Sequence, residues 1–140
     1  MKTRLIWMAA AAGLVLSACG DDGSGIEAQD LRGSWSATIY QLTDDADGQN
    51  QVDLIQRDGA SFTLTVDAAG VASTVFDDGV GGTSSDSGTL DSTGTTLTLS
   101  GTPFTAVRAG DVLTLNDFDA SFDFGSGMTA ASLLIVMSRN

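Results

Sequence analysis

The sequence predicts an all-β fold, namely a small up-and-down antiparallel β-barrel of about eight strands. Turn-forming pairs such as Asp47-Gly48, Asp58-Gly59 and Ala109-Gly110 recur along the chain, mostly about 8–12 residues apart. Between these turns, apolar residues alternate with Thr, Ser and Asp at the strand period of two. The segments leave no room for the helical crossovers of a parallel sheet, so the strands are antiparallel, and closure into a barrel removes the exposed edges of the sheet.

The expected strands share one pattern, in which an apolar face lies toward the core and a polar face toward water. Their apolar positions are Trp35, Ala37 and Ile39; Phe62, Leu64 and Val66; Leu97 and Leu99; Leu113 and Leu115; and Phe118, Ala120, Phe122 and Phe124. A last strand at 133–137 is apolar on both faces. Residues 52–57 fit either a short strand or one helical turn, and they are a candidate lid or plug at one end of the barrel.

The chain begins with the features of a secretory signal peptide at residues 1–18. Lys2 and Arg4 precede an apolar run from Leu5 to Leu16 that ends in small residues. The 12 residues of this run are too few to span a membrane as a helix. Residues 19–32 follow as a flexible acidic tether, and residues 33–140 form the folded domain.

The end of the apolar run, Leu16-Ser17-Ala18-Cys19, resembles the lipobox of bacterial lipoproteins. The resemblance implies cleavage before Cys19 and attachment of a diacylglyceryl group and an acyl chain such as palmitate to that cysteine, which holds the protein on the membrane. Gly20 stands where an aspartate would imply retention at the inner membrane, so we expect attachment to the outer membrane, facing the periplasm or the cell surface. The alternative is an ordinary signal peptide with a chance cysteine, which would leave an unpaired thiol in an oxidising compartment.

The charge and composition of the chain limit the classes of molecule that it could bind. After residue 18 the chain has no lysine, and its four arginines against 18 acidic residues give a formal charge of −14, which would repel nucleic acid and anionic lipid headgroups. Cations or a basic protein remain as partners, unless the carboxylates serve only solubility. With no histidine and one lipidated cysteine, we expect no disulfide, no metal site built on thiolate or imidazole, and no cofactor.

Catalytic constellations are also missing, so we expect the protein not to be an enzyme. Nucleophilic catalysis lacks a histidine, a free thiol and a Gly-x-Ser-x-Gly turn. Asp45-Ala46-Asp47-Gly48 resembles the middle of an EF-hand loop, but Thr43 and Leu54 occupy the positions of its first and last acidic ligands, so this match fails.

A run of acidic residues near the end of the chain alternates with phenylalanines. Strand alternation would place Asp117, Asp119, Ser121 and Asp123 on one face, about 6.8 Å apart, opposite Phe118, Phe122 and Phe124. We interpret this face as a solvated outer surface. The alternative is a ridge that binds cations or contacts a basic partner.

The domain as a whole is similar to the lipocalins and to the small lipocalin-like domains of bacterial lipoproteins. The similarity covers about residues 31–140 and rests on Gly33-Ser34-Trp35 in the first strand, the β-meander, and Arg139 after the closing strand. It implies that the first and last strands are neighbours, that Arg139 lies over Trp35 at the closed end, and that the barrel forms a cup. If the cup holds a ligand, we expect it to be lined by Phe62, Leu64, Phe122 and Phe124.

These observations favour a monomeric, non-catalytic envelope lipoprotein that acts through surface contacts. The first alternative is a carrier whose barrel binds a small apolar ligand or lipid. The second is an inhibitor of a basic secreted enzyme, which depends on charge alone.

Overall fold

The computed structural model of the protein describes residues 28–90, 96–99 and 101–140. The predicted signal peptide, the lipobox with Cys19 and the first part of the tether lie outside these residues. The described elements are α1 Ala28–Leu31, β1 Gly33–Asp44, β2 Gln51–Asp53, α2 Leu54–Asp58, β3 Ser61–Val66, β4 Val71–Asp77, β5 Thr83–Leu90, β6 Thr96–Leu99, β7 Thr102–Ala109, β8 Val112–Asp123 and β9 Met128–Arg139.

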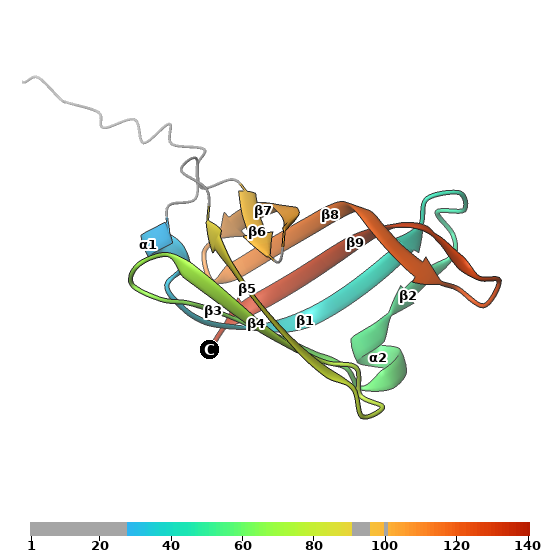
Figure 1. Ribbon diagram of the computed structural model, residues 1–140, viewed down its shortest axis with the longest axis horizontal. Coiled ribbons are helices and arrows are strands. Elements are labelled where there is room, and N and C mark those ends of the chain that lie inside the picture. Colours follow the sequence, from blue (N-terminus) through green and yellow to red (C-terminus); the bar gives the residue numbers. More distant parts are fainter. Residues whose placement is uncertain (1–27, 91–95, 100) are drawn as a thin grey trace, which may run out of the picture.

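The strands form a closed antiparallel barrel of eight strands, similar to a small lipocalin, which confirms the predicted fold class. From β3 onward each strand pairs with the next one in sequence, and pairing between β1 and β9 closes the sheet. The closing ladder runs from the Trp35–Arg139 pair to the Asp44–Ala131 pair. In Figure 1 the long strands β8, β9 and β1 lie side by side, and the helices α1 and α2 mark opposite ends of the barrel.

The remaining strand, β2, lies outside the eight-stranded barrel and pairs with the part of the β1 edge that β3 does not occupy. Residues 33–36 of β1 pair with β3, whereas residues 41–43 pair with β2. The Asp53 carboxylate then accepts a hydrogen bond from the Ile55 amide at 3.0 Å and begins α2, which ends at Gly59 in the left-handed conformation. The segment 52–57 is therefore a strand followed by a helical turn, and its Leu54 is buried in the core.

The core consists of side chains at alternate, inward positions of the strands. Its fully buried members are Leu31, Trp35, Leu64, Leu97, Leu113, Leu115, Ile135 and Met137. The last strand, β9, lies between β1 and β8, with Ile135 and Met137 inside and Leu134 and Val136 half-buried on the outer face. The predicted apolar character of both its faces thus corresponds to the core on one side and a partly exposed surface on the other.

The domain begins earlier than the sequence predicts. Residues 28–31, placed in the tether, form the short helix α1, and Leu31 is 0% exposed. The Trp35 indole N–H donates a hydrogen bond to the Leu31 carbonyl at 2.8 Å, which holds the helix against the end of the barrel. A single leucine beside a polar segment has no periodicity, so its burial depends on a tertiary contact that the local pattern does not reveal.

The predicted acidic face of β8 is wrong at its first two positions. Asp117 is only 7% exposed and Phe118 is 67% exposed, the reverse of the expectation. The register with β9 shifts between Asp117 and Ala120, and this bulge exchanges the two faces of the strand. Only Asp119, Ser121 and Asp123 share the exposed face, and Asp123 accepts hydrogen bonds from the Gly125 and Gly127 amides in the following turn.

Candidate functional site

The end of the barrel beside α1 is closed by Trp35 and Arg139. The arginine guanidinium lies 4.7 Å from the centre of the buried indole ring, the contact that the lipocalin resemblance implied. Its Nη2 donates to the Asp30 carbonyl at 2.6 Å, and its backbone amide donates to the Asp111 carbonyl at 3.0 Å. A cation over an indole contributes roughly 0.5–2 kcal/mol. These contacts give Trp35 and Arg139 a structural role at this end of the barrel.

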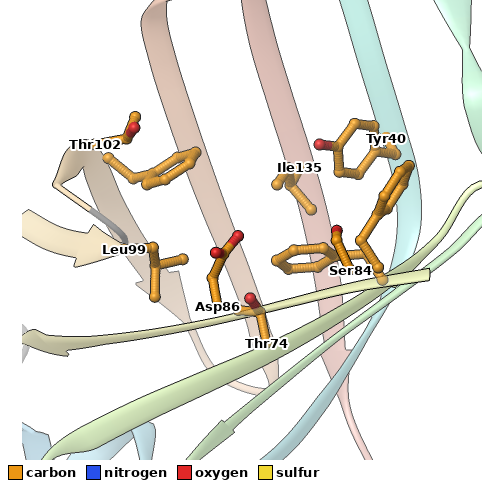
Figure 2. A pocket seen from close by; sticks show the side chains of 10 residues that line it. Tyr40, Thr74, Ser84, Asp86, Leu99, Thr102 and Ile135 are labelled. Carbon is orange, nitrogen blue, oxygen red and sulfur yellow. The ribbon is translucent and has the colours of Figure 1, made fainter. Parts of the chain in front are cut away.

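A pocket of about 160 Å³ lies inside the barrel, further from α1. Ten side chains from seven strands line it, and each occupies an inward position of its strand (Figure 2). They are Tyr40, Phe62, Thr74, Phe76, Ser84, Asp86, Leu99, Thr102, Phe104 and Ile135. The site therefore exists only when the barrel closes, because no two adjacent strands carry more than a few of its members.

Aromatic rings form much of the pocket wall. The Tyr40 ring stacks on Phe76, with centroids 5.0 Å apart, and meets Phe62 in a tilted arrangement at 5.8 Å. Phe62 and Phe76 are direct partners on β3 and β4, so strand pairing itself sets these two rings together. Phe104 contributes a fourth ring from β7.

Polar groups converge on the same space. Figure 2 shows the Asp86 carboxylate and the Tyr40 hydroxyl oxygen turned toward the interior of the pocket. Thr74, the cross-strand partner of Asp86, is buried, and none of the ten lining residues is basic. Burial raises the pKa of Tyr40 to about 12, and the negative charges of Asp117 and Asp86 add to the increase. The phenol is therefore a neutral hydrogen-bond donor near neutral pH, in a negatively charged surrounding.

The pocket opens beside β5. This strand pairs with β4 along its length, but its other edge pairs with β6 only at Gly88–Leu90. Likewise β7 pairs with β8 only as far as Asn116. The short β6–β7 hairpin therefore covers the half of the barrel nearest α1, and Ser84 and Asp86 remain exposed to solvent.

The structure brings together only part of the predicted cavity lining. Phe62 lines the pocket, but Leu64 is 0% exposed within the core and does not. Phe122 and Phe124 lie outside the pocket and pack edge to face at 5.0 Å, with the Arg57 guanidinium 5.5 Å from the Phe122 ring. Phe62, Phe122 and Phe124 all alternate with polar residues in the sequence, and only the pairing of their strands distinguishes the one that lines the pocket.

The sequence analysis missed Tyr40, Phe76, Phe104 and Asp86. Phe76 and Phe104 had a weak signal, since each lies two residues after an inward residue of its strand. Tyr40 lacked this signal, because the bulge between Ala37 and Ile39 breaks the alternation before it. Asp86 had none, because β5 reads Thr-Ser-Ser-Asp-Ser-Gly-Thr-Leu and only its final residue is apolar. Its inward position follows from its pairing with Thr74.

Other acidic residues serve local structure. In the EF-hand-like loop, Asp44 accepts a hydrogen bond from the Ala46 amide at 2.9 Å, and Asp47 accepts one from the Gln49 amide at 3.1 Å, so both carboxylates shape the turn. Among the residues that the structure describes, no three acidic, histidine or cysteine side chains are placed to hold a metal ion. Within residues 28–90, 96–99 and 101–140, no helix has the length and apolar character to cross a membrane.

Comparison of the chain with protein-family models, with curated proteins and with solved structures finds no match.

Proposed function

We propose that this protein is a non-catalytic, lipid-anchored envelope protein whose barrel binds a small ligand in the interior pocket. The observation that carries the proposal is the convergence of four aromatic rings, a carboxylate and a protonated phenol on one space within a closed barrel. Mostly apolar cavities with a few convergent polar groups are typical binding sites. This observation favours the carrier over the surface-contact interpretation.

The size of the pocket limits the ligand. Sites for drug-sized molecules usually measure about 300–1,000 Å³, whereas a cavity of about 150 Å³ accommodates one benzene ring. At about 160 Å³ this pocket matches a single ring or a small branched group. A phospholipid or a long fatty acid is too large, so we restrict the proposal to small molecules.

The lipobox supports the location that we propose. Cleavage before Cys19 would leave residues 20–27 between the lipid and α1, a short link that keeps the barrel near the outer membrane. The absence of histidine and of a second cysteine from the sequence supports a non-catalytic role, because the serines lack a histidine partner that would activate them and no cysteine remains as a nucleophile if Cys19 carries the lipid.

Surface contacts with another protein are the second candidate function. The net charge supports it, as do the exposed apolar side chains Val107 and Phe118, which are 55% and 67% exposed. Inhibition of a basic secreted enzyme is a special case of this candidate and would give binding that weakens as salt is added.

Native mass spectrometry of residues 20–140, recovered under gentle conditions, tests the binding function. This part of the chain contains all the strands and all the core residues that the structure describes. We expect an added small mass that is lost on denaturation and is reduced by Phe76→Ala, with Phe118→Ala on the outer face as the matched control. A bare mass, together with Tyr40 ring signals that do not respond to a panel of small aromatic, alcohol and amine compounds, would contradict ligand binding and favour surface contacts.

A further inference from the structure

We infer that the ligand of the pocket is a small organic cation, an ammonium group that carries apolar substituents. The inference rests on the proposed binding function and names the chemical class that the pocket would take. It depends on three features of the site: the ring faces, the sign of the charge, and the route to solvent.

The ring faces suit a cation with an apolar surface. Tyr40, Phe62 and Phe76 form a contiguous group with centroid separations of 5.0 and 5.8 Å, and Phe104 adds a ring from β7. The negative face of an aromatic ring attracts an ammonium group within about 6 Å of the centroid, and several rings together are a known way of holding quaternary ammonium groups. The methyl groups of such an ion bury apolar surface at the same time.

The charge of the pocket selects among ligands. The Asp86 carboxylate lines the space, and the charge of the buried Asp117 acts on the Tyr40 side chain from β8. Among the described residues all four arginines lie elsewhere, since Arg32 donates to the Ala68 carbonyl and the other three contact Asp58, Asp30 and Asp111. The two carboxylates would repel an anion and attract a cation, and the attraction of the buried Asp117 is screened less by water than that of the exposed Asp86.

A neutral ligand and a metal ion both fit less well. A neutral apolar molecule would contact the rings but would gain nothing from the negative charge of Asp86. A calcium ion takes six to eight oxygen ligands, and the pocket lining offers one carboxylate with the Thr74, Thr102 and Ser84 hydroxyls among aromatic rings. An ammonium ion with apolar substituents would gain from both the negative charge and the ring faces.

The open side of the pocket gives the cation a route from solvent. Ser84 and Asp86 lie on the exposed part of β5, where the strand has no partner on its second edge among the described residues. Asp86 therefore stands between bulk water and the rings. A cation would meet this carboxylate first and then place its apolar groups against Tyr40 and Phe76.

Choline and its neutral isostere, in which carbon replaces the quaternary nitrogen, form the decisive pair of probes. Both are titrated into the full chain, purified in a non-ionic detergent, while NMR follows the Tyr40 ring and the Ile135 methyl signals. We expect choline to shift these signals and to bind at least about tenfold more tightly than the isostere, because only choline has cation–π and ionic attraction.

A substitution then tests whether the charge that attracts choline is that of Asp86. Asp86→Asn keeps the size of the side chain and removes its charge, and we expect it to weaken choline binding at least about tenfold. Asp119→Asn removes the same charge from the exposed outer face of β8 and should leave choline binding unchanged.

The outcomes separate the two proposals. If the isostere binds as tightly as choline, or if the two variants affect choline equally, the pocket still binds a ligand but the organic-cation inference is wrong. If neither probe moves the Tyr40 and Ile135 signals, and no small mass co-purifies, both the inference and the binding function fail. The comparison of probes on the unsubstituted chain keeps the test valid even if Asp86→Asn unfolds.

Discussion

The ionisation of Tyr40 gives a sharp quantitative test of the barrel interior. It is the only tyrosine, and no lysine follows residue 18, so few other groups titrate in the same range. Its pKa of about 12 in the folded protein compares with an ordinary value of 10.0. Because the folded state holds the phenol proton more tightly than the unfolded chain, this stability is fully present below pH 10 and is lost as the pH rises toward 12.

The size of the expected change in the free energy of unfolding follows from the pKa shift of Tyr40. One pKa unit corresponds to about 1.4 kcal/mol, so the free energy of unfolding should fall by an amount on the order of 2 kcal/mol across this range. The desolvation of the phenol is the main cause, and Asp117 and Asp86 contribute the rest. The same two carboxylates are the charges that would attract a cation.

Two assays read this prediction. Near-ultraviolet absorbance of tyrosinate follows the ionisation directly in the folded state, and urea unfolding at a series of pH values follows stability. Tyr40→Phe is the control, and its stability should lack the alkaline decline. Tyrosinate that appears in the folded protein with an ordinary pKa, or an equal alkaline loss of stability in Tyr40→Phe, would refute the burial of this phenol beside the two carboxylates.

Three further predictions follow from particular contacts. Leu31→Ala should lower the free energy of unfolding by about 2–5 kcal/mol, as for other fully buried leucines, and clearly more than Leu134→Ala on the outer face of β9; equal losses in urea unfolding would argue against docking of α1. Gly88→Ala should destabilise the barrel because a Cβ there would collide with the Thr98 carbonyl, whereas Gly48→Ala meets nothing within 4 Å and should be neutral in thermal unfolding; a neutral Gly88→Ala would contradict the pairing of β5 with β6. Cys19→Ala should release the expressed chain from membranes in a carbonate wash, and retention of the variant would contradict the lipid anchor.

Much of the fold could be predicted from the sequence because its signals are local. The period of two in segments such as Phe62-Thr-Leu64-Thr-Val66 and the glycine turns between strands depend only on neighbouring residues. The bulges could not be predicted in this way. Neither the shift between Ala37 and Ile39 nor that between Asp117 and Ala120 coincides with a glycine, so both appear only when the strands are paired. The first bulge brings Tyr40 into the interior, and the second turns Ala120 and Phe122 toward the core. Asp117 lies before the second bulge, where it continues the inward alternation of Leu113 and Leu115.

The pocket could be predicted even less, because its residues are scattered over seven strands. Apolar patterning favoured Phe122 and Phe124, but both lie outside the pocket, where Phe122 packs against Arg57 and against Phe124. The residue that gives the pocket its charge, Asp86, lies in a strand that has almost no apolar residues. An inward carboxylate on an open strand conflicts with local patterning, and such conflicts are expected at functional positions.

The barrel interior has two halves along its axis, one apolar and densely packed and the other lined in part by polar side chains. Near α1 the inward residues Trp35, Leu64, Leu113 and Met137 are all 0% exposed, and their tight packing supplies stability. Toward the other end, β1 and β8 place Asp44 and Asp117 inside, and β4 adds the buried Thr74. Backbone hydrogen bonds compensate both carboxylates, since Asp44 accepts from the Ala46 amide and Asp117 accepts from the Asp119 amide, so both stay buried without the cost of an unpaired polar group. The bulge in β1 places Tyr40 and Asp44 on the inward side, and the regular alternation of β8 before its own bulge places Asp117 there, so one end of the barrel interior is polar while the other is densely packed.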